Sequence, residues 1–365
     1  MQQLRLGIIG VGNMGSHYAK LVLNGQVPRC QLTAVCDTDA AKLKLYPSAA
    51  TFTDSDELLA SGTVDAVLIA TPHYAHTTIG IAALTAGLHV LVEKPLSVHK
   101  ADCQRLLAAH RDPRQVFATV FNQRTDPRYR AIRDLIVSGR LGSIQRVQWT
   151  VTDWFRSAAY YASGGWRATW AGEGGGVLLN QSVHNLDLYQ WLFGLPQRVR
   201  AVCHLGKYHS IEVEDEVTAI FEHADGATGV FVTSTGEAPG VNRLEIAADR
   251  GRVLLEGDQL TFWRNRIATS VHSRATKQNF LPPPSYRNFR TISDHGPQHL
   301  GVLRNFVSAI LRGTKLIAPA ADGEAAVELI NAMLLSSFKN SAVILPLSAA
   351  EYTRLLRRLI SSRER

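Results

Sequence analysis

The feature that most constrains this chain is a glycine motif between an apolar run and a helical pattern. Gly10-Val11-Gly12-Asn13-Met14-Gly15 follows the apolar run of residues 4–9 and opens a helix predicted for residues 14–24. Asp37 ends the next apolar run, 22 residues after Gly15. A strand, a glycine turn, a helix and a later acidic residue are together typical of a domain that binds a dinucleotide.

Each residue of this motif has a predicted task. Gly10 makes the tight turn, Gly12 lets the backbone approach a pyrophosphate, and Gly15 lets the helix pack on the strand. The free N–H groups of the helix N-terminus would face the phosphates. Asp37 would accept from both ribose hydroxyls and repel a 2′-phosphate, which favours NAD. NADP stays an alternative, because a neighbouring basic side chain could relax this preference, and a glycine turn without a ligand is the other interpretation.

The first third of the chain alternates short apolar runs with helical patterns. This alternation predicts a doubly wound parallel sheet, a Rossmann domain, over residues 1–122. The predicted strands cover residues 4–9, 32–36, 64–70, 90–93 and 116–121. The predicted helices cover residues 14–24, 54–60, 77–86 and 101–110.

Residues 123–365 follow a different pattern and are predicted to form a second α/β domain. One helix is expected over 177–193, and successive antiparallel strands with hairpin turns at Asp225-Gly226 and Arg250-Gly251 are expected over 199–262. Residues 264–297 are polar and proline-rich and are predicted to be a long loop. Three closing helices, near 298–312, 323–339 and 348–360, are candidates to pack back on the first domain.

The composition is that of an ordinary globular protein, with 45% hydrophobic and 19% charged residues in a chain of 365. Four scattered cysteines predict reduced core residues, and neither a disulfide frame nor a metal site is expected. No signal peptide or membrane span is predicted, so the expected location is the cytoplasm. The net charge of +8 and the arginine cluster at 354–365 predict a solvated helix face more than nucleic-acid binding.

Lys94 follows the apolar run of residues 90–93 in the sequence Glu93-Lys94-Pro95. Open α/β sheets bind ligands at the carboxyl ends of their strands, so Lys94 is expected at the cleft where a nicotinamide would lie. A desolvated lysine there has a lowered pKa and exchanges protons near neutrality. The alternative is a surface lysine at a strand end.

A second chemical cluster follows the triple glycine of residues 174–176. On the predicted helix, Asn180, His184, Asp187 and Trp191 would share one face. His184 is the group best suited to take a hydroxyl proton near pH 7. Asn180 could hold a substrate hydroxyl but is no base, and Asp187 would either orient His184 or satisfy a buried donor. The glycines would allow close approach to a ligand.

Other residues complete the predicted cleft. Aromatic rings and arginines between residues 154 and 170 are suited to the faces and hydroxyls of a sugar, with a packed Ω-loop as the alternative. The histidines of the segment after residue 69 are expected to line the cofactor cleft more than to bind a metal. The further predicted cofactor contacts are Asn13, Met14, Ala70, Thr71, Pro72, His73, His76, Glu93, Asn122, Trp166 and Arg167. The predicted substrate contacts beside Lys94 and His184 are Asn122, Arg124, Arg156, Tyr161, Trp170, Asn180 and Gln181.

The glycine motif, Glu93-Lys94-Pro95 and the Gly-Gly-Gly…His184-x-x-Asp187 segment, in this order, resemble the Gfo/Idh/MocA oxidoreductase family. The resemblance implies a Rossmann domain followed by an α/β domain whose open, mainly antiparallel sheet often forms an oligomer interface, hence a homodimer or homotetramer. It also implies that Lys94 and His184 are the catalytic pair. Many members carry aspartate where this chain has Asn180. The aromatic segment is similar to the subgroup of levoglucosan dehydrogenase and sugar 3-dehydrogenases.

The expected function is therefore an NAD-dependent dehydrogenase that oxidises a secondary hydroxyl of a sugar, anhydrosugar or cyclitol to a ketone. One alternative is a ketosugar reductase or a dehydrogenase of nucleotide-linked sugars. Another is a non-catalytic sensor that binds NAD or NADP, although such a protein has no need of both Lys94 and His184. The expected partner is a small polyol or sugar, without nucleic acid or membrane.

Overall fold

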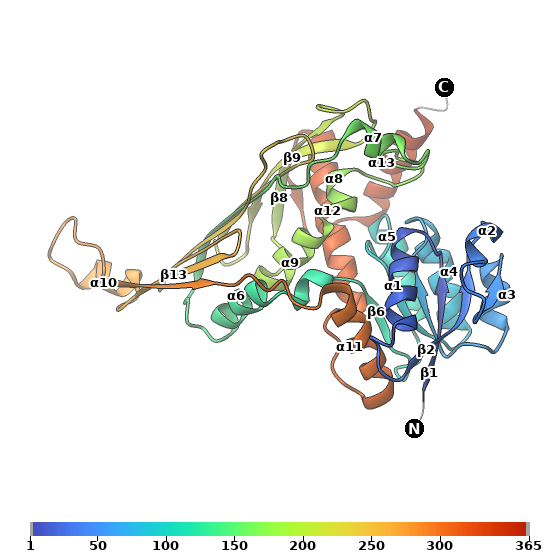
Figure 1. The fold of residues 1–365 in the computed structure, drawn as a ribbon. Helices are drawn as coiled ribbons and strands as arrows, with labels where there is room; N and C mark the ends of the chain where they lie inside the picture. The colour runs from blue at the N-terminus through green and yellow to red at the C-terminus, as the bar shows by residue number, and fades with distance from the viewer. Residues whose placement is uncertain (1–2, 363–365) are drawn as a thin grey trace.

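The computed structural model describes residues 3–362 and contains two sheets (Figure 1). The first is a six-stranded parallel sheet in the order β3-β2-β1-β4-β5-β6, which confirms the predicted Rossmann domain. Its strands are β1 (Leu4–Ile9), β2 (Cys30–Cys36), β3 (Ala50–Phe52), β4 (Ala66–Ile69), β5 (His89–Val92) and β6 (Phe117–Thr119). Its helices are α1 (Asn13–Leu23), α2 (Ala40–Leu43), α3 (Ser55–Ala60), α4 (Ala75–Thr85) and α5 (Lys100–Ala109).

The second sheet has nine strands in the order β14-β13-β12-β11-β7-β10-β9-β8-β15. β7 and β10 run parallel, and the other neighbours run antiparallel, as the expected mainly antiparallel sheet requires. The strands are β7 (Ile144–Val151), β8 (Arg198–Leu205), β9 (Glu214–Glu222), β10 (Thr228–Ser234), β11 (Asn242–Ala248), β12 (Gly251–Glu256), β13 (Gln259–Asn265), β14 (Ser285–Thr291) and β15 (Val343–Ile344).

Helices of the second half cover one face of this sheet and bridge to the first domain (Figure 1). The helices that follow β6 are η1 (Asn122–Thr125), α6 (Pro127–Val137), α7 (Ala158–Ala162), α8 (Val177–Asn180), α9 (Val183–Phe193), α10 (Thr269–Ala275), α11 (Gln298–Arg312), α12 (Ala320–Lys339) and α13 (Ala349–Ser361). Arg363 and Arg365 of the terminal arginine cluster lie outside the described residues. Of the helices formed by residues 3–362, none combines the length and the apolar character that a membrane span needs.

Local sequence signals explain many of these element boundaries. Asp54 caps α3 by accepting hydrogen bonds from the backbone N–H groups of Asp56 and Glu57. Asp126 caps α6 in the same way, with Pro127 at the first helical position. The two predicted hairpin turns join β9 to β10 and β11 to β12.

The short elements β3 and α2 of the first domain are not among the predicted ones, and two predicted segments differ in the structure. The single helix expected over 177–193 is wrong, because the chain breaks into α8 and α9 at Gln181 and Ser182. There the N–H of Ser182 donates to the carbonyl of Val177, five residues back, and its hydroxyl bonds to Thr233. The loop expected over 264–297 is also wrong, because it contains α10 and the edge strand β14. β14 pairs with β13, and together with α10 they form an arm that projects from the molecule (Figure 1).

The closing helices return to the first domain. Val302, Leu303 and Phe306 of α11 belong to the same buried cluster as Leu6 and Ile8 of β1. Farther along, the buried Lys100 at the start of α5 donates to Glu328 of α12 at 2.7 Å and to the carbonyl of Leu347 at 3.0 Å. Hydrophobic burial and a charge-assisted contact therefore both hold the end of the chain against the Rossmann sheet.

A buried ion pair joins the end of the Rossmann domain to the helices of the second half. The Arg124 guanidinium in η1 donates to both carboxylate oxygens of Asp187 in α9, at 2.5 and 2.8 Å. Its remaining nitrogen donates to Asp322 in α12 at 2.6 Å. Arg124 and Asp187 are each only 1% exposed at their side chains, whereas Asp322 is 38% exposed. The pair therefore fixes α9 against η1 where water cannot compete.

We expect Asp187→Asn to lower the free energy of unfolding by about 3 kcal/mol, because it leaves the buried Arg124 without its full counter-charge. Urea unfolding followed by circular dichroism measures this loss. The matched control is Asp322→Asn, which removes a solvent-screened partner of the same arginine and should cost less than about 1 kcal/mol. Equal losses in the two variants would contradict the importance of burial at Asp187.

Candidate active site

The glycine turn between β1 and α1 has the shape that a dinucleotide requires. Gly10 has a φ of +86°, which favours glycine, and a Cβ on Gly15 would lie 1.8 Å from the carbonyl oxygen of Gly10. A Cβ on Gly12 would instead meet nothing within 4 Å, so this backbone faces open space. α1 begins at Asn13 without an acidic residue in its first turn. The turn therefore fits phosphate groups at a helix N-terminus.

Asp37 lies directly after β2 and is held by the glycine turn. One of its carboxylate oxygens accepts the N–H of Val11 at 2.9 Å, and the other accepts the N–H of Asp39 at 3.0 Å. The ammonium of Lys42, which is 43% exposed, lies 3.2 Å from the second oxygen. Asp37 is thus placed as expected for a ribose contact, but a flexible cation accompanies it. This cation would compensate part of its repulsion of a 2′-phosphate.

The segment from Ala70 to His76 adjoins the glycine turn, as predicted. His73 donates from Nδ1 to the carbonyl of Glu173 at 3.0 Å. The ring nitrogens of His76 lie 2.8 Å from the carbonyl of Pro95 and 2.9 Å from that of Thr71. Both histidines therefore contact backbone, and residues 3–362 contain no group of three metal-ligating side chains.

Lys94 lies at the carboxyl end of β5 and is largely enclosed. Its ammonium donates to the backbone carbonyl of Asn180 at 2.8 Å and lies 3.3 Å from the side-chain oxygen of the same residue. Burial lowers the pKa of Lys94, while the carboxylates of Glu93 and Glu173 act in the opposite direction. Glu93 is itself buried and accepts the hydroxyl of Tyr18 at 2.6 Å. Lys94 therefore has the lowered pKa that its position at the end of the strand predicts.

His184 stands in the first turn of α9 and is kept neutral by its surroundings. Burial, with the charges of Lys94 and His299, holds the pKa of His184 well below its usual range. Its Nδ1 atom is buried and finds no hydrogen-bond partner among residues 3–362. A neutral imidazole with a free nitrogen can accept a proton. Asp187 does not orient His184, because both of its carboxylate oxygens accept hydrogen bonds from Arg124. Its role is therefore the alternative one, in which it satisfies a buried donor.

The triple glycine makes close contacts inside the protein, and these replace the expected approach to a ligand. A Cβ on Gly176 would lie 1.9 Å from the carbonyl oxygen of Glu214, and one on Gly174 would lie 2.1 Å from the side chain of Val98. The carboxylate of Glu214 also accepts the N–H groups of Gly176 and Leu178. The glycines therefore allow the backbone before α8 to pack closely against the start of β9.

The aromatic loop between β7 and α8 is held together by stacked arginines. The Arg167 guanidinium lies 4.6 Å from the ring centroid of Trp166 and 4.7 Å from that of Tyr160. The guanidinium of Arg156 also lies over the ring of Tyr160, 5.2 Å from its centroid. The hydroxyl of Tyr161 forms a hydrogen bond with the hydroxyl of Thr235 at 2.9 Å. The charges of both arginines lower the pKa of Lys94, which places this loop near the site.

Two predicted substrate contacts lie elsewhere. Trp170 is buried in the core and packs edge-on against Phe338, with ring centroids 6.1 Å apart. Arg124 is buried in its ion pairs with Asp187 and Asp322, so it does not face the cleft. Each was placed in the cleft because of its position in the sequence, and tertiary burial decides otherwise.

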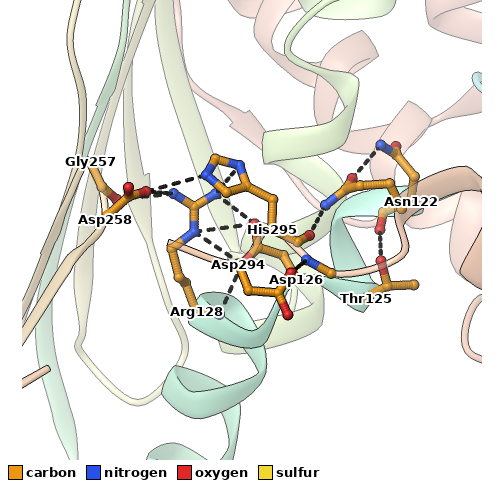
Figure 2. Close-up of polar contacts among 10 residues, drawn as sticks. Asn122, Thr125, Asp126, Arg128, Gly257, Asp258, Asp294 and His295 are labelled. Atoms are coloured by element: carbon orange, nitrogen blue, oxygen red, sulfur yellow. Dashed lines mark hydrogen bonds and ion pairs between the residues drawn. The ribbon is translucent and has the colours of Figure 1, made fainter. Parts of the chain in front are cut away.

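Asn122 contacts the loop that leads into α11 (Figure 2). Its amide donates to Gln298 at 2.7 Å, while its carbonyl oxygen is buried without a partner among residues 3–362. Arg128 contacts this loop at His295, and its guanidinium also donates to Asp126 and Asp258 (Figure 2).

This loop brings His299 to the site, a residue that the sequence analysis missed. His299 packs edge-on against His17 and Tyr18, with ring centroids 5.7 and 5.9 Å apart. Burial and the charges of His17 and Lys94 lower the pKa of His299 to about 4. It lies 115 residues after His184 in the sequence, and no local pattern connects the two.

Glu173 is the second residue that was missed, and here the sequence does hold a signal. It is the one acidic residue between Asp153 and Asp187. In the structure its carboxylate is buried and accepts the side-chain N–H of Asn180 and the backbone N–H of Ala168. A carboxylate in an aromatic, glycine-rich segment must find buried donors, and those donors lie beside Lys94.

Three buried polar atoms of residues predicted to contact cofactor or substrate have no hydrogen-bond partner in the described part of the chain. They come from the segment after β4, from η1 and from α9, and within residues 3–362 none of them is satisfied: Thr71 Oγ1, Asn122 Oδ1 and His184 Nδ1. Buried polar atoms are normally satisfied. Together with the open space at Gly12, they fit a bound nicotinamide cofactor and a hydroxylated substrate.

Comparison with known families agrees with this site. A model described as an oxidoreductase family with an NAD-binding Rossmann fold matches residues 4–121. A model of the GFO/IDH/MocA C-terminal domain matches residues 129–254. Between them the two models cover well over half of the chain. The first match confirms the prediction that residues of the first domain bind NAD.

Individual relatives are distant but extend over much of the chain. An inositol 2-dehydrogenase from Rhizobium meliloti is 25% identical over 346 residues, which are 91% of this chain and 96% of the relative. A trans-1,2-dihydrobenzene-1,2-diol dehydrogenase from Bos taurus is 28% identical over 263 residues, which are 69% of this chain and 74% of the relative.

Solved structures share the fold at low sequence identity. The WlbA dehydrogenase from Bordetella pertussis, in complex with NADH and UDP-GlcNAcA, aligns with a TM-score of 0.78 at 24% identity, over 95% of this chain and all of that one. Levoglucosan dehydrogenase in complex with NADH and levoglucosan aligns with a TM-score of 0.78 at 22% identity, over the same shares. These likenesses establish the fold.

We expect Asp37→Ser to lower the preference for NADH over NADPH by about tenfold or more, because it removes a charge that repels the 2′-phosphate and frees Lys42 to meet it. Fluorescence titration of the two reduced cofactors measures both dissociation constants without a substrate. The double variant Asp37→Ser with Lys42→Ala is the control and should lose most of the gain in NADPH affinity. An unchanged ratio in Asp37→Ser would show that Asp37 does not contact the ribose.

We expect Glu214 to make stability depend on pH. Burial raises the pKa of Glu214 to about 7 from a usual value of 4.5. Its contribution is therefore fully present below pH 4.5 and is lost as the pH rises through 7, by roughly 3 kcal/mol at most. Glu214→Gln lacks this titration, so its melting temperature should gain on the wild type between pH 5 and pH 8. A constant difference across this range would contradict the raised pKa.

Proposed function

Because the chain belongs to the Gfo/Idh/MocA oxidoreductase family, we propose that it is an NAD-dependent dehydrogenase that oxidises a secondary hydroxyl of a sugar, anhydrosugar or cyclitol to a ketone. The observation that carries the proposal is the proximity of Lys94 to His184, whose pKa is lowered by burial and by the charge of this lysine. Relatives named for inositol and for a cyclic diol support a ring-shaped polyol as the substrate class.

The proposed mechanism divides the proton chemistry between these two side chains. NAD, when bound, supplies the hydride acceptor at C4 of its nicotinamide. His184 takes the hydroxyl proton, since its imidazole is neutral and one nitrogen is free. Lys94 donates a hydrogen bond to the same oxygen and stabilises the negative charge that develops there. Asn180, which contacts Lys94, is placed to hold the substrate hydroxyl.

The cofactor and substrate contacts come from both halves of the chain. We propose residues 1–122 as the cofactor domain and residues 123–365 as the domain for substrate binding and oligomerisation. Cofactor contacts are Gly10, Gly12, Asn13, Met14, Gly15, Asp37, Ala70, Thr71, Pro72, His73, His76, Glu93, Lys94, Asn122, Trp166 and Arg167. Substrate contacts are Lys94, Asn122, Arg156, Tyr161, Asn180, Gln181 and His184. Aromatic rings of the loop suit the C–H faces of a sugar ring.

We also propose that the protein acts in the cytoplasm as a homodimer or homotetramer. The uncovered face of the nine-stranded sheet exposes Val202 and Ile220, at 54% and 50% of their surface. Apolar side chains on an open sheet face support a contact with a second copy. Nucleotide-linked sugars are the alternative substrate class, for which Arg156 and Arg167 would meet the phosphates. Both arginines already lie over aromatic rings, which favours the simpler sugar.

We expect the purified protein to reduce NAD with one class in a panel of sugars, anhydrosugars, cyclitols and sugar nucleotides. His184→Ala should lose about 10²- to 10⁴-fold in kcat, because it removes the general base. Lys94→Ala should also lose activity, through the lost charge stabilisation. The rise in NADH absorbance measures the turnover of the wild type and of both variants.

Two outcomes would contradict this proposal in different ways. Intact turnover in Lys94→Ala would refute the mechanism. Tight binding of NAD or NADP by the wild type without turnover of any panel compound would support a non-catalytic sensor.

A further inference from the structure

Asn180 stands beside Lys94 at a position where many family members carry a carboxylate. An amide cannot supply the missing negative charge, yet Lys94 is enclosed next to Arg156 and Arg167, which both disfavour its protonated form. A charged lysine in such surroundings needs a counter-charge. The structure offers a counter-charge at Glu173, which is separated from Lys94 by the side chain of Asn180.

The Glu173 carboxylate reaches Lys94 through the Asn180 side chain. Glu173 is 2% exposed, and one of its oxygens accepts the N–H of Ala168 at 2.7 Å. Its other oxygen accepts the side-chain N–H of Asn180 in a short hydrogen bond. The side-chain oxygen of Asn180 then faces the Lys94 ammonium at 3.3 Å. The three side chains therefore form a continuous path from carboxylate to amide to ammonium.

The direction of this path is set by hydrogen-bond chemistry. An ionised carboxylate only accepts, so it binds the N–H end of the Asn180 amide and turns the oxygen end toward the ammonium, which only donates. The hydroxyl of Tyr160 lies 3.2 Å from the same Asn180 nitrogen, 3.3 Å from that of Gln181 and 3.0 Å from a nitrogen of Arg167. These contacts hold the amide in one orientation.

Charge acts along the same line. Glu173 raises the pKa of Lys94 against burial, and Lys94 in turn lowers that of the buried Glu173. The other ionisable groups that act on Lys94 or on which its charge acts are Glu93, Arg156, Arg167, His73, His76, His184 and His299. Glu93 is held by Tyr18 and by the Lys94 backbone N–H, so Glu173 is the carboxylate on the Asn180 side.

We propose that Glu173 is the positioning carboxylate of this site, which keeps Lys94 protonated and directed at the reacting oxygen through Asn180. Only the expected effect on turnover rests on the proposed dehydrogenase function. The coupling of Glu173 to Lys94 is a property of the protein without substrate. Because the Asn180 amide lies between the Glu173 carboxylate and Lys94, Glu173 does not itself act as a base, and His184 remains the base next to the substrate.

The decisive variant is Glu173→Gln, which keeps the size of the side chain and removes its charge. Ala168 still requires an acceptor, so the new amide N–H would face Asn180 and rotate its nitrogen toward Lys94, donor against donor. We expect the pKa of Lys94, followed by NMR of lysine labelled with ¹³C and ¹⁵N, to fall by about one unit. The alkaline limb of the profile of kcat against pH should shift down by the same amount, with the dissociation constant for NADH unchanged.

Rescue and control variants separate positioning from structural support. Asn180→Asp added to Glu173→Gln returns a carboxylate to the side of Lys94 and should restore the Lys94 titration. Glu214→Gln removes another buried carboxylate that also accepts backbone N–H groups of this region, and should leave that titration in place. Where Glu173→Gln fails to fold, Asn180→Ala in the wild-type background breaks the same path and should lower the pKa of Lys94 by about one unit in the same NMR titration.

A Lys94 titration that is identical in wild type and Glu173→Gln, with only a lower melting temperature in the variant, would overturn the inference and make Glu173 a loop-capping residue. Failure of the dehydrogenase proposal would look different. The wild type would turn over no compound of the panel, while the NMR titration would still report whether Glu173 and Lys94 are coupled.

Discussion

The buried contact between Arg124 and Asp187 is the interaction on which the site depends. Arg124 ends the Rossmann half, and Asp187 lies one helical turn after His184 in α9. Because both side chains are enclosed, a shift of α9 would expose an unpaired charge to an apolar interior. The position of the imidazole relative to β5 and Lys94 is therefore fixed by electrostatics, although neither Arg124 nor Asp187 is placed to touch a ligand.

Around this contact the site is assembled from backbone as much as from side chains. The glycine turn leaves a flat, open surface at Gly12, and the carbonyl of Asn180 receives the Lys94 ammonium. Glu214 fastens the backbone that leads into α8. Lys94 and the backbone around α8 are thus held by hydrogen bonds to other parts of the protein, which leaves them little freedom to reorganise during a reaction.

The sequence predicted those parts of the molecule whose physics is local. Five of the six Rossmann strands, the glycine turn and Lys94 at a strand end follow from short patterns, whereas the three-residue edge strand β3 does not. Arg124 and Trp170 were misplaced because their burial depends on α12 and on Phe338, far away in the chain. The break at Ser182 depends likewise on Thr233 in another strand. His299 joins the site only through tertiary packing, which no window of sequence contains.

The return of α11 to the first sheet has a consequence for how the chain is made. The core that contains Leu6 and Ile8 is completed by Val302, Leu303 and Phe306, which are synthesised some 300 residues later. The first domain therefore cannot close its core when its own strands leave the ribosome, and must wait with an apolar surface open until nearly the whole chain has emerged. During synthesis this apolar surface stays exposed to water for longer than the compact N-terminal pattern suggests.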